Sequence, residues 1–341
     1  MKNIFIIHRG LSSEIINSQM LEIINNINKI YNIETLPVCH ISDDKKITQK
    51  KEMFNSLVWY LINKNDVNYI YTRSVFEFIS IYFIKKIFFK KWNIIFDFRG
   101  MISEESYLRH KNKYKRYMLR GLEFFAYKYA DRIHTVSYSF KNYLIHGFGE
   151  KNIKVYPCAI NTSLLKVKED KKILNFIYLG SISSWQKFDE TINLYKYIEQ
   201  QIGNTKLTVI TRQKKEAEKI IYDYNLKNIE IKSLTHEKVL EDLKNYDFGF
   251  LLRDNITVNN VASPIKFLEY ISNGIIPIMT KGIGDYSDIA RGFKIGVIVE
   301  DGLSCEIAKL NEILEDKGIY SRMNNISSKY IWGNILKGFY D

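Results

Sequence analysis

The stretch ASPIKFLEYISNGIIPI, Ala262–Ile278, has the pattern of a short helix followed by a buried strand. Ser263 is a residue type that caps helix starts, and Pro264 suits the first helical position. The Asn-Gly pair at 273–274 is typical of a helix end, because glycine tolerates the left-handed backbone found there. The apolar run 275–278 then indicates a short buried strand.

Helical periodicity divides the side chains of this helix between two faces. At about 100° per residue, Phe267, Leu268 and Ile271 share one side. Lys266 and Glu269 share the opposite side, so we expect both to leave the core together. A helix start with a lysine beside it is a seat for a pyrophosphate, and a carboxylate one turn further can accept hydrogen bonds from a ribose diol. The alternative is an ordinary i,i+3 surface pair.

Composition indicates a globular chain long enough for two domains. The 341 residues are 46% hydrophobic and 26% charged, which argues against a disordered or fibrous protein. Lys and Arg outnumber Asp and Glu by 50 to 38, giving a formal charge of +12. A basic chain favours anionic partners. Much of the lysine accompanies abundant Asn and Ile, so clusters of charge are more informative than the total.

Cysteine usage and hydropathy argue against several other classes. Cys39, Cys158 and Cys305 are far apart and show no CxxC spacing, so neither a disulfide framework nor a zinc site is indicated. The start of the chain, 1–10, lacks the cleavage site of a signal peptide and reads as a strand. Charged residues interrupt the apolar region 74–98 before it approaches the ~20 residues of a spanning helix. We therefore expect a cytoplasmic enzyme.

Strand-like and helical segments alternate along the whole chain. The expected strands are 4–7, 68–72, 93–97, 133–137, 153–156, 176–180, 206–211, 229–232, 248–252 and 275–279. This alternation predicts an α/β fold with parallel sheets covered on both faces. The polar run 161–172 marks a boundary between two repeats of the same rhythm. We expect two Rossmann-like doubly wound domains that face a central crevice.

Residues that follow strands in the first half are candidates for a site, because ligands of such sheets bind at the carboxyl ends of strands. This rule selects Gly10, Arg73 and Arg99. An arginine beside a glycine can present its guanidinium to a phosphate or a carboxylate. Internal pairing of Arg99 with Asp97 or Glu104 is the alternative.

The same rule selects cations in the second half. Arg253 ends the strand before the quoted helix, so we expect it beside Ser263 and Lys266, where a second cation can share a diphosphate. Lys187 and Arg212 stand near two other strand ends and are weaker candidates of the same kind. A solvated side chain is the alternative for both.

Several catalytic motifs are absent from the sequence. It contains no GxGxxG after the first strand and no GxxxxGK[ST], so dehydrogenase and P-loop functions lose their main support. HExxH and GxSxG are also absent, which argues against metalloprotease and serine-hydrolase chemistry. His8, His134 and His236 lie near strand ends or turns, and we interpret them as structural.

Two stretches mix basic and aromatic residues. They are 83–92 (FIKKIFFKKW) and 107–129, which holds seven Lys and Arg residues interleaved with aromatic ones. Such a pattern suits helices that lie on an anionic membrane. Base stacking in a basic groove would look similar, but no RNP, KH or zinc-finger pattern supports it, so we expect no nucleic acid. A solvated helix face is the other alternative.

With these residues assembled, the chain resembles the family-four retaining glycosyltransferases, which have the GT-B architecture. The segment 263–278 is similar to a variant of the family's Glu-x7-Glu motif written SPxKLxEYxxxGxPVI. The resemblance implies that Glu269 holds the donor ribose and that Lys266 lies beside the diphosphate. The first Glu of the longer motif falls at Val261, so the carboxylate that usually contacts the donor sugar is absent.

Two further segments carry the resemblance. The segment 178–190 is similar to YxGSxxxWxxxDE, and it places Ser181 where the family usually has an arginine and Lys187 near its usual lysine. The segment 97–105 resembles the DxRGxxxDE sequence of an acceptor domain, which implies that Glu104 lies on the acceptor side with Arg99, Arg73 and Gly10. No single motif decides the family, but their order and spacing agree.

The resemblance implies an activity and a division of labour. We expect an acceptor-binding domain at 1–164 with a closing helix at 328–341, and a nucleotide-sugar-binding domain at 165–327. A hexosyl or N-acetylhexosaminyl group would pass from a nucleotide-diphosphate sugar to a glycan or polyprenol-linked acceptor with retention of configuration. The pathway implied is synthesis of a bacterial capsule, lipopolysaccharide or other surface glycan, at the inner face of the cell membrane.

The resemblance also suggests residue roles. Lys266, Arg253 and Arg99 would stabilise negative charge electrostatically. Donor binding would involve Glu269, Lys266, Ser263, Pro264, Ser181, Lys187, Arg212 and Arg253. We expect no cofactor and no metal, since no DxD-like motif is present, and we name no nucleophile.

Two rival functions stay open from the sequence. A GT-B-type nucleotide-sugar epimerase would isomerise its donor without an acceptor, and would ordinarily need more carboxylates and histidines in the crevice. A non-catalytic protein that binds anionic membranes or nucleic acid would show salt-sensitive binding that survives Glu269→Ala.

Overall fold

The computed structural model describes residues 2–7, 16–31, 34–39, 67–161, 173–182, 184–299 and 307–340. The chain splits into two compact units. Unit 1 comprises Met1–Pro157 with Trp332–Asp341, and unit 2 comprises Cys158–Ile331. The divisions expected from the sequence, after 164 and after 327, lie a few residues from these junctions. None of the described helices combines the length and apolarity that a membrane span requires.

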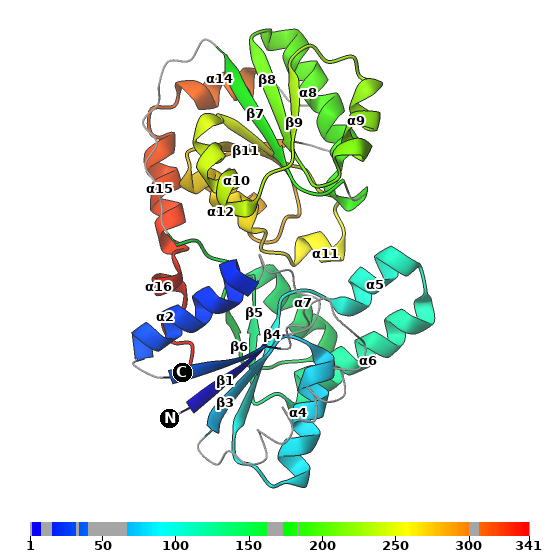
Figure 1. Ribbon diagram of the computed structural model, residues 1–341, viewed down its shortest axis with the longest axis vertical. Coiled ribbons are helices and arrows are strands. Elements are labelled where there is room, and N and C mark those ends of the chain that lie inside the picture. The colour runs from blue at the N-terminus through cyan, green and yellow to red at the C-terminus, as the bar shows by residue number, and fades with distance from the viewer. Residues whose placement is uncertain are drawn as a thin grey trace. The chain divides into compact units, whose positions relative to one another are not determined.

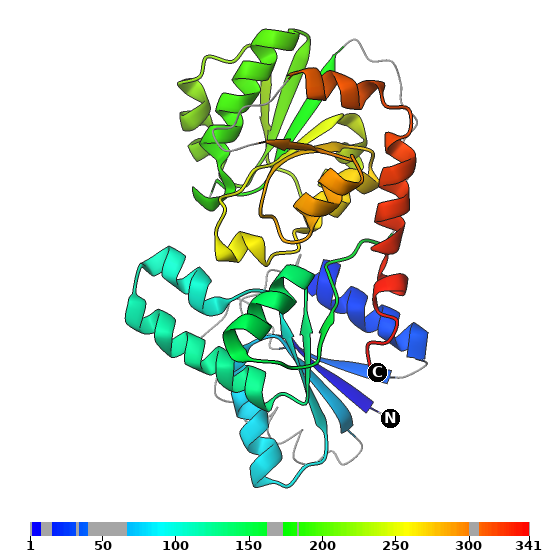
Figure 2. The same cartoon turned by 180° about the vertical axis from the view of Figure 1, so that it is seen from behind.

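Unit 1 is built on a six-stranded parallel sheet with the order β2-β1-β3-β4-β5-β6. Helices lie on both faces of the sheet (Figures 1 and 2). The strand order reverses between β1 and β3, so the residues that follow β3 lie at the usual ligand position of a doubly wound sheet. The strands are β1 (Lys2–Ile7), β2 (Glu34–Cys39), β3 (Val67–Thr72), β4 (Asn93–Phe98), β5 (Arg132–Thr135) and β6 (Ile153–Val155).

The helices of unit 1 include a hairpin of two long neighbours, α5 and α6, which projects from the sheet (Figure 1). Ser74 and Ser137 accept hydrogen bonds from the first turns of α4 and α7, which is why these helices begin there. The described helices are η1 (Ile16–Leu21), α2 (Glu22–Tyr31), α4 (Val75–Ile87), α5 (Ile102–His110), α6 (Lys113–Tyr129), α7 (Tyr138–Phe148) and α16 (Trp332–Ile335).

The end of the chain closes unit 1 in a way that differs from the expected helix at 328–341. α15 ends at Lys329, and α16 covers only Trp332–Ile335 before the chain continues in turns. The ring of Phe339 is buried, with its centroid 4.7 Å from that of His134 and 5.9 Å from that of Tyr71. Aromatic packing, rather than a continuous helix, therefore anchors this segment.

Unit 2 contains a second six-stranded parallel sheet, with the order β12-β11-β10-β7-β8-β9 and helices on both faces (Figures 1 and 2). Its order reverses between β7 and β10. The strands are β7 (Leu174–Leu179), β8 (Thr205–Ile210), β9 (Ile229–Lys232), β10 (Phe248–Leu251), β11 (Ile276–Thr280) and β12 (Val297–Val299). The helices are η2 (Ser184–Gln186), α8 (Phe188–Ile202), α9 (Lys214–Tyr222), α10 (His236–Asp242), η3 (Leu243–Asn245), α11 (Thr257–Asn260), α12 (Ile265–Ser272), α13 (Tyr286–Gly292), α14 (Ile307–Glu315) and α15 (Ile319–Lys329).

The core of unit 2 fixes α12, the helix of the quoted stretch. The prediction that Phe267, Leu268 and Ile271 face the core is confirmed, because each is at most 1% exposed. α12 packs against β10, β11 and α15. Gly249 of β10 leaves room for this packing, since a Cβ there would lie 2.5 Å from the ring of Tyr270. The helix is therefore held rigidly above the sheet edge that carries the candidate site.

Candidate functional site

Two strand ends meet where the order of the second sheet reverses. β7 and β10 are neighbours, and the chain leaves them through Gly180 and Arg253. α12, which carries Lys266 and Glu269, follows a short way after β10. Ligands of doubly wound sheets bind at such a reversal, outside the carboxyl ends of the strands. The site is therefore built from β7, β10 and α12, as the strand-end rule predicts.

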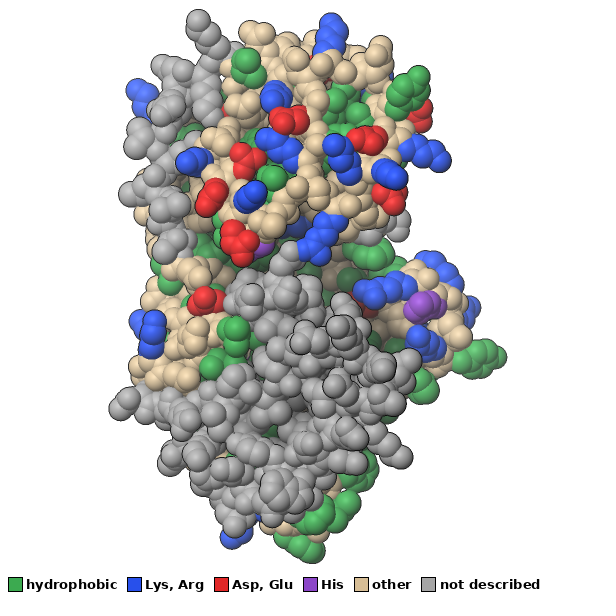
Figure 3. Space-filling model, in the orientation of Figure 1, with side chains coloured by type: hydrophobic (Ala, Val, Ile, Leu, Met, Phe, Trp, Pro, Cys, Tyr) green, Lys and Arg blue, Asp and Glu red, His purple; other side chains and the backbone are tan. Residues whose placement is uncertain are grey.

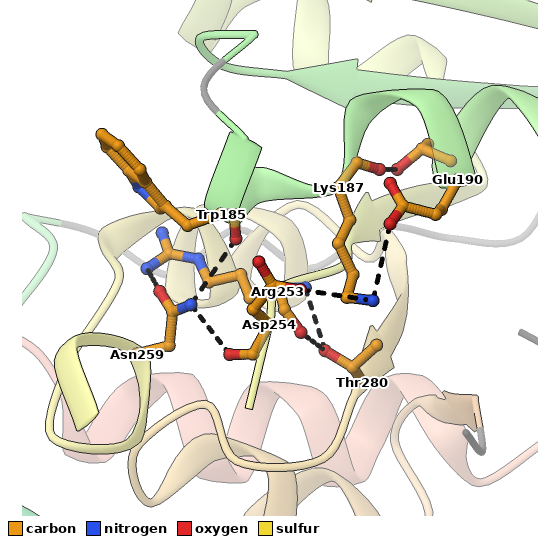
Figure 4. Close-up of polar contacts among 8 residues, drawn as sticks. Trp185, Lys187, Glu190, Arg253, Asp254, Asn259 and Thr280 are labelled. Carbon is orange, nitrogen blue, oxygen red and sulfur yellow. Dashed lines mark hydrogen bonds and ion pairs between the residues drawn. The ribbon is translucent and has the colours of Figure 1, made fainter. Parts of the chain in front are cut away.

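Arg253 is held firmly but has no carboxylate partner among the described residues. Its backbone N–H donates to Thr280 Oγ1 (2.9 Å), and the Thr280 hydroxyl donates to the carbonyl of Arg253 (2.8 Å). Its Nη1 donates to Asn259 Oδ1 at 3.3 Å (Figure 4). Its Nε is buried, and no group in the described part of the chain accepts its proton. Burial lowers the pKa of Arg253, yet a guanidinium remains charged in proteins.

The carboxylate next to Arg253 in the sequence is turned toward another cation. Lys187 Nζ lies 3.3 Å from Asp254 Oδ1 and 3.6 Å from Glu190 Oε1 (Figure 4). Asn259 donates to the carbonyl of Asp254 at 2.9 Å and so fixes this turn of the chain. Lys187 therefore pairs with Asp254, and Arg253 keeps no carboxylate partner among the described residues.

Lys266 is the second cation of the site. Its Nζ donates to the amide oxygen of Gln186 at 3.2 Å rather than to a carboxylate. Burial of the ammonium, and then the positive charge of Arg253, lower the pKa of Lys266 to about 7 against the attraction of Glu269. A Cβ at Gly180 would lie 2.4 Å from Nζ and would displace the ammonium, so the glycine leaves room for Lys266 where β7 ends. Arg253 and Lys266 thus lie near each other, and no described carboxylate forms an ion pair with either of them, an arrangement that favours binding of an anion.

Glu269 is buried, which corrects the expectation that it leaves the core with Lys266. Only 5% of the residue is exposed, and its Oε1 lies 3.2 Å from His236 Nε2. Periodicity assigned Glu269 correctly to the face opposite Phe267 and Leu268, but α10 brings His236 onto that face. A substitution of Glu269 therefore acts on a buried group as well as on a ligand contact.

The start of α12 also differs from the prediction. The helix begins at Ile265, with Pro264 in the capping position and no side chain that caps it. Ser263 does not cap the helix, because its Oγ is hydrogen-bonded to the Tyr286 hydroxyl (2.9 Å) and accepts from the backbone N–H of Cys158 (3.2 Å). The N-terminal end of α12 thus keeps its positive dipole end without a side-chain acceptor.

Ser181 and Arg212 complete the predicted donor residues. Ser181 is exposed, and its Oγ accepts from Gln186 Nε2 at 2.9 Å. Because Gln186 also accepts from Lys266, Ser181 contributes to the site through that amide. Arg212 is exposed beyond the end of β8, on the surface of the same sheet edge.

The predicted acceptor-side residues of unit 1 meet only in part. Arg73 and Arg99 converge on Asp97, with Nε–Oδ2 distances of 3.2 and 2.5 Å, and the Tyr71 hydroxyl donates to the same oxygen. Asp97 is fully buried. Burial alone would raise its pKa, but the charges of Arg99 and Arg73 hold the pKa of Asp97 below its ordinary value. The alternative of internal pairing for Arg99 is therefore what the structure shows.

Glu104 stands apart from that cluster. Glu104 on α5 accepts from Arg116 Nη2 on α6 at 2.9 Å, so it joins the two helices of the hairpin. Gly10 lies outside the described residues. In the cluster around Asp97, the Nη2 atom of Arg73 is buried with no acceptor among the described residues.

Four residues of the donor-side site were missed from the sequence. Gln186 contacts Lys266, and His236 contacts Glu269. Asn259 and Thr280 both contact Arg253. Thr280 ends β11, so the strand-end rule could have found it. Asn259 and Gln186 sit in short helical turns with no distinguishing pattern, and His236 was interpreted as structural.

Comparison with solved structures identifies the fold. The Anabaena protein HepE in complex with UDP-glucose matches with a TM-score of 0.72 at 13% identity, covering 100% of this chain and 98% of that chain. The lipopolysaccharide outer core galactosyltransferase WaaB gives a TM-score of 0.69 at 14% identity with the same coverage. Sucrose-phosphate synthase from Thermosynechococcus elongatus gives 0.73 at 12% identity, covering 99% and 97%. The chain has the GT-B fold.

The GT-B assignment confirms the predicted fold class over the full length of the chain. No family model matches the chain, and neither does any curated protein. Within the ranges that the structure describes, no group of three or more His, Cys, Asp or Glu side chains is placed to hold a metal ion.

Proposed function

We propose that the protein is a glycosyltransferase that moves a sugar from a nucleotide-diphosphate donor to an acceptor, with retention of configuration and without a metal. The observation that carries this proposal is the pair of cations at the sheet reversal of unit 2. Arg253 has a buried Nε without an acceptor, and Lys266 is close enough for Arg253 to lower its pKa. A diphosphate supplies the missing negative charge.

Each residue of the proposed donor site has its own role. Arg253, Lys266 and the N-terminal end of α12 stabilise the charge that develops on the leaving diphosphate, an electrostatic contribution made by preorganised groups. Glu269 accepts hydrogen bonds from the donor ribose. Lys187 and Ser181 act indirectly, through Asp254 and through Gln186. The names of the compared structures support this assignment, since they include a UDP-glucose complex and a galactosyltransferase.

The acceptor side follows from unit 1. We propose that Arg73 and Arg99 face the acceptor, because they follow β3 and β4 at the carboxyl ends of the strands, where ligands of such sheets bind. Arg73 Nη2 is buried with no acceptor among the described residues, so it can donate to a ligand. We propose a glycan or polyprenol-linked acceptor and transfer of a hexosyl or N-acetylhexosaminyl group in the synthesis of a bacterial surface glycan. The resemblance of the motifs at 97–105 and 263–278 supports this pathway.

The test is a ligand screen by thermal shift and calorimetry, with EDTA present. UDP, GDP, ADP, CMP and their sugar conjugates are each added to the purified protein. A ligand that binds only the folded state raises the unfolding midpoint by an amount that follows RT ln(1 + [L]/Kd). We expect one nucleoside diphosphate to raise it, whereas no shift with any of them would overturn the donor site.

A surface of unit 1 supports contact with an anionic membrane. Large hydrophobic side chains project from the end of α4 and from α6, where Phe89 and Tyr114 are each 89% exposed. Basic residues are interleaved with them, and Figure 3 shows blue and green side chains together over the α5–α6 hairpin on the right. Apolar side chains inserted at the interface with cations at the headgroups are typical of peripheral binding. We propose that this surface holds the enzyme at the inner face of the membrane.

Charge reversal at the end of α4 tests this contact. We expect the protein to sediment with phosphatidylglycerol vesicles and not with phosphatidylcholine vesicles. Lys90→Glu with Lys91→Glu should weaken binding more than about tenfold, since each Lys near such a surface contributes about 1 kcal/mol. Lys206→Glu with Lys238→Glu, two exposed positions of unit 2, is the matched control. Equal binding by both double variants would contradict the proposal.

A further inference from the structure

Glu269 contacts a histidine that belongs to another helix. His236 lies at the first residue of α10, and its Nε2 is 3.2 Å from Glu269 Oε1 although the two residues are 33 positions apart. The Glu269 side chain is 6% exposed and the His236 side chain 36% exposed. The pKa of His236 is raised, first by its hydrogen bond to Glu269 and also by the negative charges of Glu269 and Glu237. The contact thus pairs a buried carboxylate with a partly exposed imidazole.

Within α12 itself, Glu269 has a competing partner. Lys266 precedes it by three positions, a spacing at which side chains of a helix meet and ion pairs form. In the structure, however, the ammonium of Lys266 donates to Gln186, and Glu269 contacts His236. The carboxylate of Glu269 and the ammonium of Lys266 therefore contact different residues and not each other. An ion pair between them would neutralise the cation that the diphosphate needs and would occupy the carboxylate that the ribose needs.

We propose that His236 is a positioning residue of the donor site, which holds Glu269 through Oε1 and keeps it away from Lys266, so that Oε2 accepts from the ribose hydroxyls. This inference rests on the proposed function. It explains why a histidine with no role in the transfer itself stands against the buried carboxylate. It also assigns the segment between β9 and β10 to the recognition of ribose.

The test compares nucleotides that differ in one ribose hydroxyl. Kd is measured by calorimetry for UDP, 2′-deoxy-UDP and 3′-deoxy-UDP with the wild type, His236→Ala and His236→Gln. The wild type should prefer UDP over at least one deoxy analogue by about tenfold, the effect of one hydrogen bond to a charged group. In His236→Ala this preference should fall below about twofold and UDP itself should bind more weakly, because Glu269 turns to Lys266.

The conservative variant and a matched control separate positioning from stability. The amide of His236→Gln can donate to Oε1 as the imidazole does, so it should restore most of the preference. Lys238→Ala, an exposed position on the same helix, should bind all three nucleotides like the wild type. A general loss of structure in His236→Ala would lower the affinity for all three nucleotides alike and would not change their ratio.

The outcomes distinguish this inference from the function on which it rests. If the wild type binds none of the nucleoside diphosphates, the proposed function itself fails. If the wild type binds UDP and His236→Ala keeps the full preference over the deoxy analogues, only the role of His236 is overturned. The role of His236 is also overturned if His236→Gln behaves like His236→Ala, because the hydrogen bond to Oε1 would then not be what positions Glu269.

Discussion

Arg253→Met should abolish detectable UDP binding without lowering the unfolding midpoint of the unliganded protein. Arg253 is a half-buried cation whose Nε is buried with no acceptor among the described residues, so the unliganded fold carries the cost of a poorly solvated charge. Methionine fills a similar volume without that charge. The loss of the donor to Asn259 Oδ1, a long contact of 3.3 Å, offsets part of the gain. A diphosphate, in contrast, loses two or more charged hydrogen bonds of about 1.5–3 kcal/mol each, which is a loss of affinity of about 100-fold or more.

Calorimetry with UDP and thermal unfolding without ligand check both halves of this prediction. Lys206→Met is the control, because Lys206 lies in the same unit and its Nζ is paired with Glu230 at 2.8 Å on the surface. This control should bind UDP like the wild type. A large fall in the unfolding midpoint of Arg253→Met would mean that the guanidinium supports the fold, and unchanged UDP binding would remove Arg253 from the donor site.

The separation of ligand binding from stability is expected wherever a site is built ahead of its ligand. Lys266 and Arg253 repel each other in the unliganded state, while the carboxylates of Asp254 and Glu269 are paired with Lys187 and His236. Functional sites commonly retain such unfavourable features, because the same charged groups that repel each other also bind the ligand. The arrangement therefore favours a binding role over a structural one.

Most of the strands and helices could be predicted from the sequence, because the periodicities of strands and helices differ. Two strands, β2 and β12, were not predicted from the sequence, and each omission has a physical reason. Pro37 lies inside β2 (Glu34–Cys39), and a proline in an apolar run argues against a strand. β2 is an edge strand of its sheet, where a missing N–H is tolerated. β12 (Val297–Val299) is an edge strand of three residues, too short to show an alternation.

The candidate site was predictable where it depends on strand ends and unpredictable where it depends on packing between distant helices. Arg253 and Lys266 converge because parallel strands end at a common edge, which sequence order alone implies. The burial of Glu269 depends on α10, and nothing in the periodicity of α12 shows which element covers its polar face. The contact of His236 with Glu269 could not be predicted for the same reason, since the two residues are 33 positions apart.

Lys266 should also make the folding stability depend on pH with a defined sign. Its pKa in the folded protein is about 7, lowered first by burial and then by Arg253, against an ordinary value of about 10.4 in the unfolded chain. Below about pH 7 both states hold the proton, and the folded state bears the full cost of a buried charge. Between these two values the unfolded state binds more protons, so stability rises with pH. Lys266→Met removes this rise, which urea unfolding at pH 7 and pH 9 measures as a difference between the two proteins.

Binding of a diphosphate should raise the pKa of Lys266 again, so that the protein takes up a proton when the ligand binds. At pH 8 the unliganded Lys266 is mostly neutral, and a bound diphosphate favours its charged form, so UDP binding should consume close to one proton and weaken by up to about tenfold per pH unit above that point. Calorimetry in buffers of different ionisation enthalpy counts the protons. A phosphate group, with a pKa of about 6, does not titrate in this range.

Lys266→Met separates this proton from that of His236, whose pKa is also raised, because the variant keeps His236 and Glu269. We expect uptake of nearly one proton at pH 8 in the wild type and almost none in Lys266→Met, which should bind UDP about tenfold or more weakly through the loss of one charged hydrogen bond. Equal uptake in the two proteins would show that Lys266 is charged before the ligand arrives. The attraction of Glu269 would then outweigh burial and Arg253, and the separation of the two charges on α12 would lose its electrostatic basis.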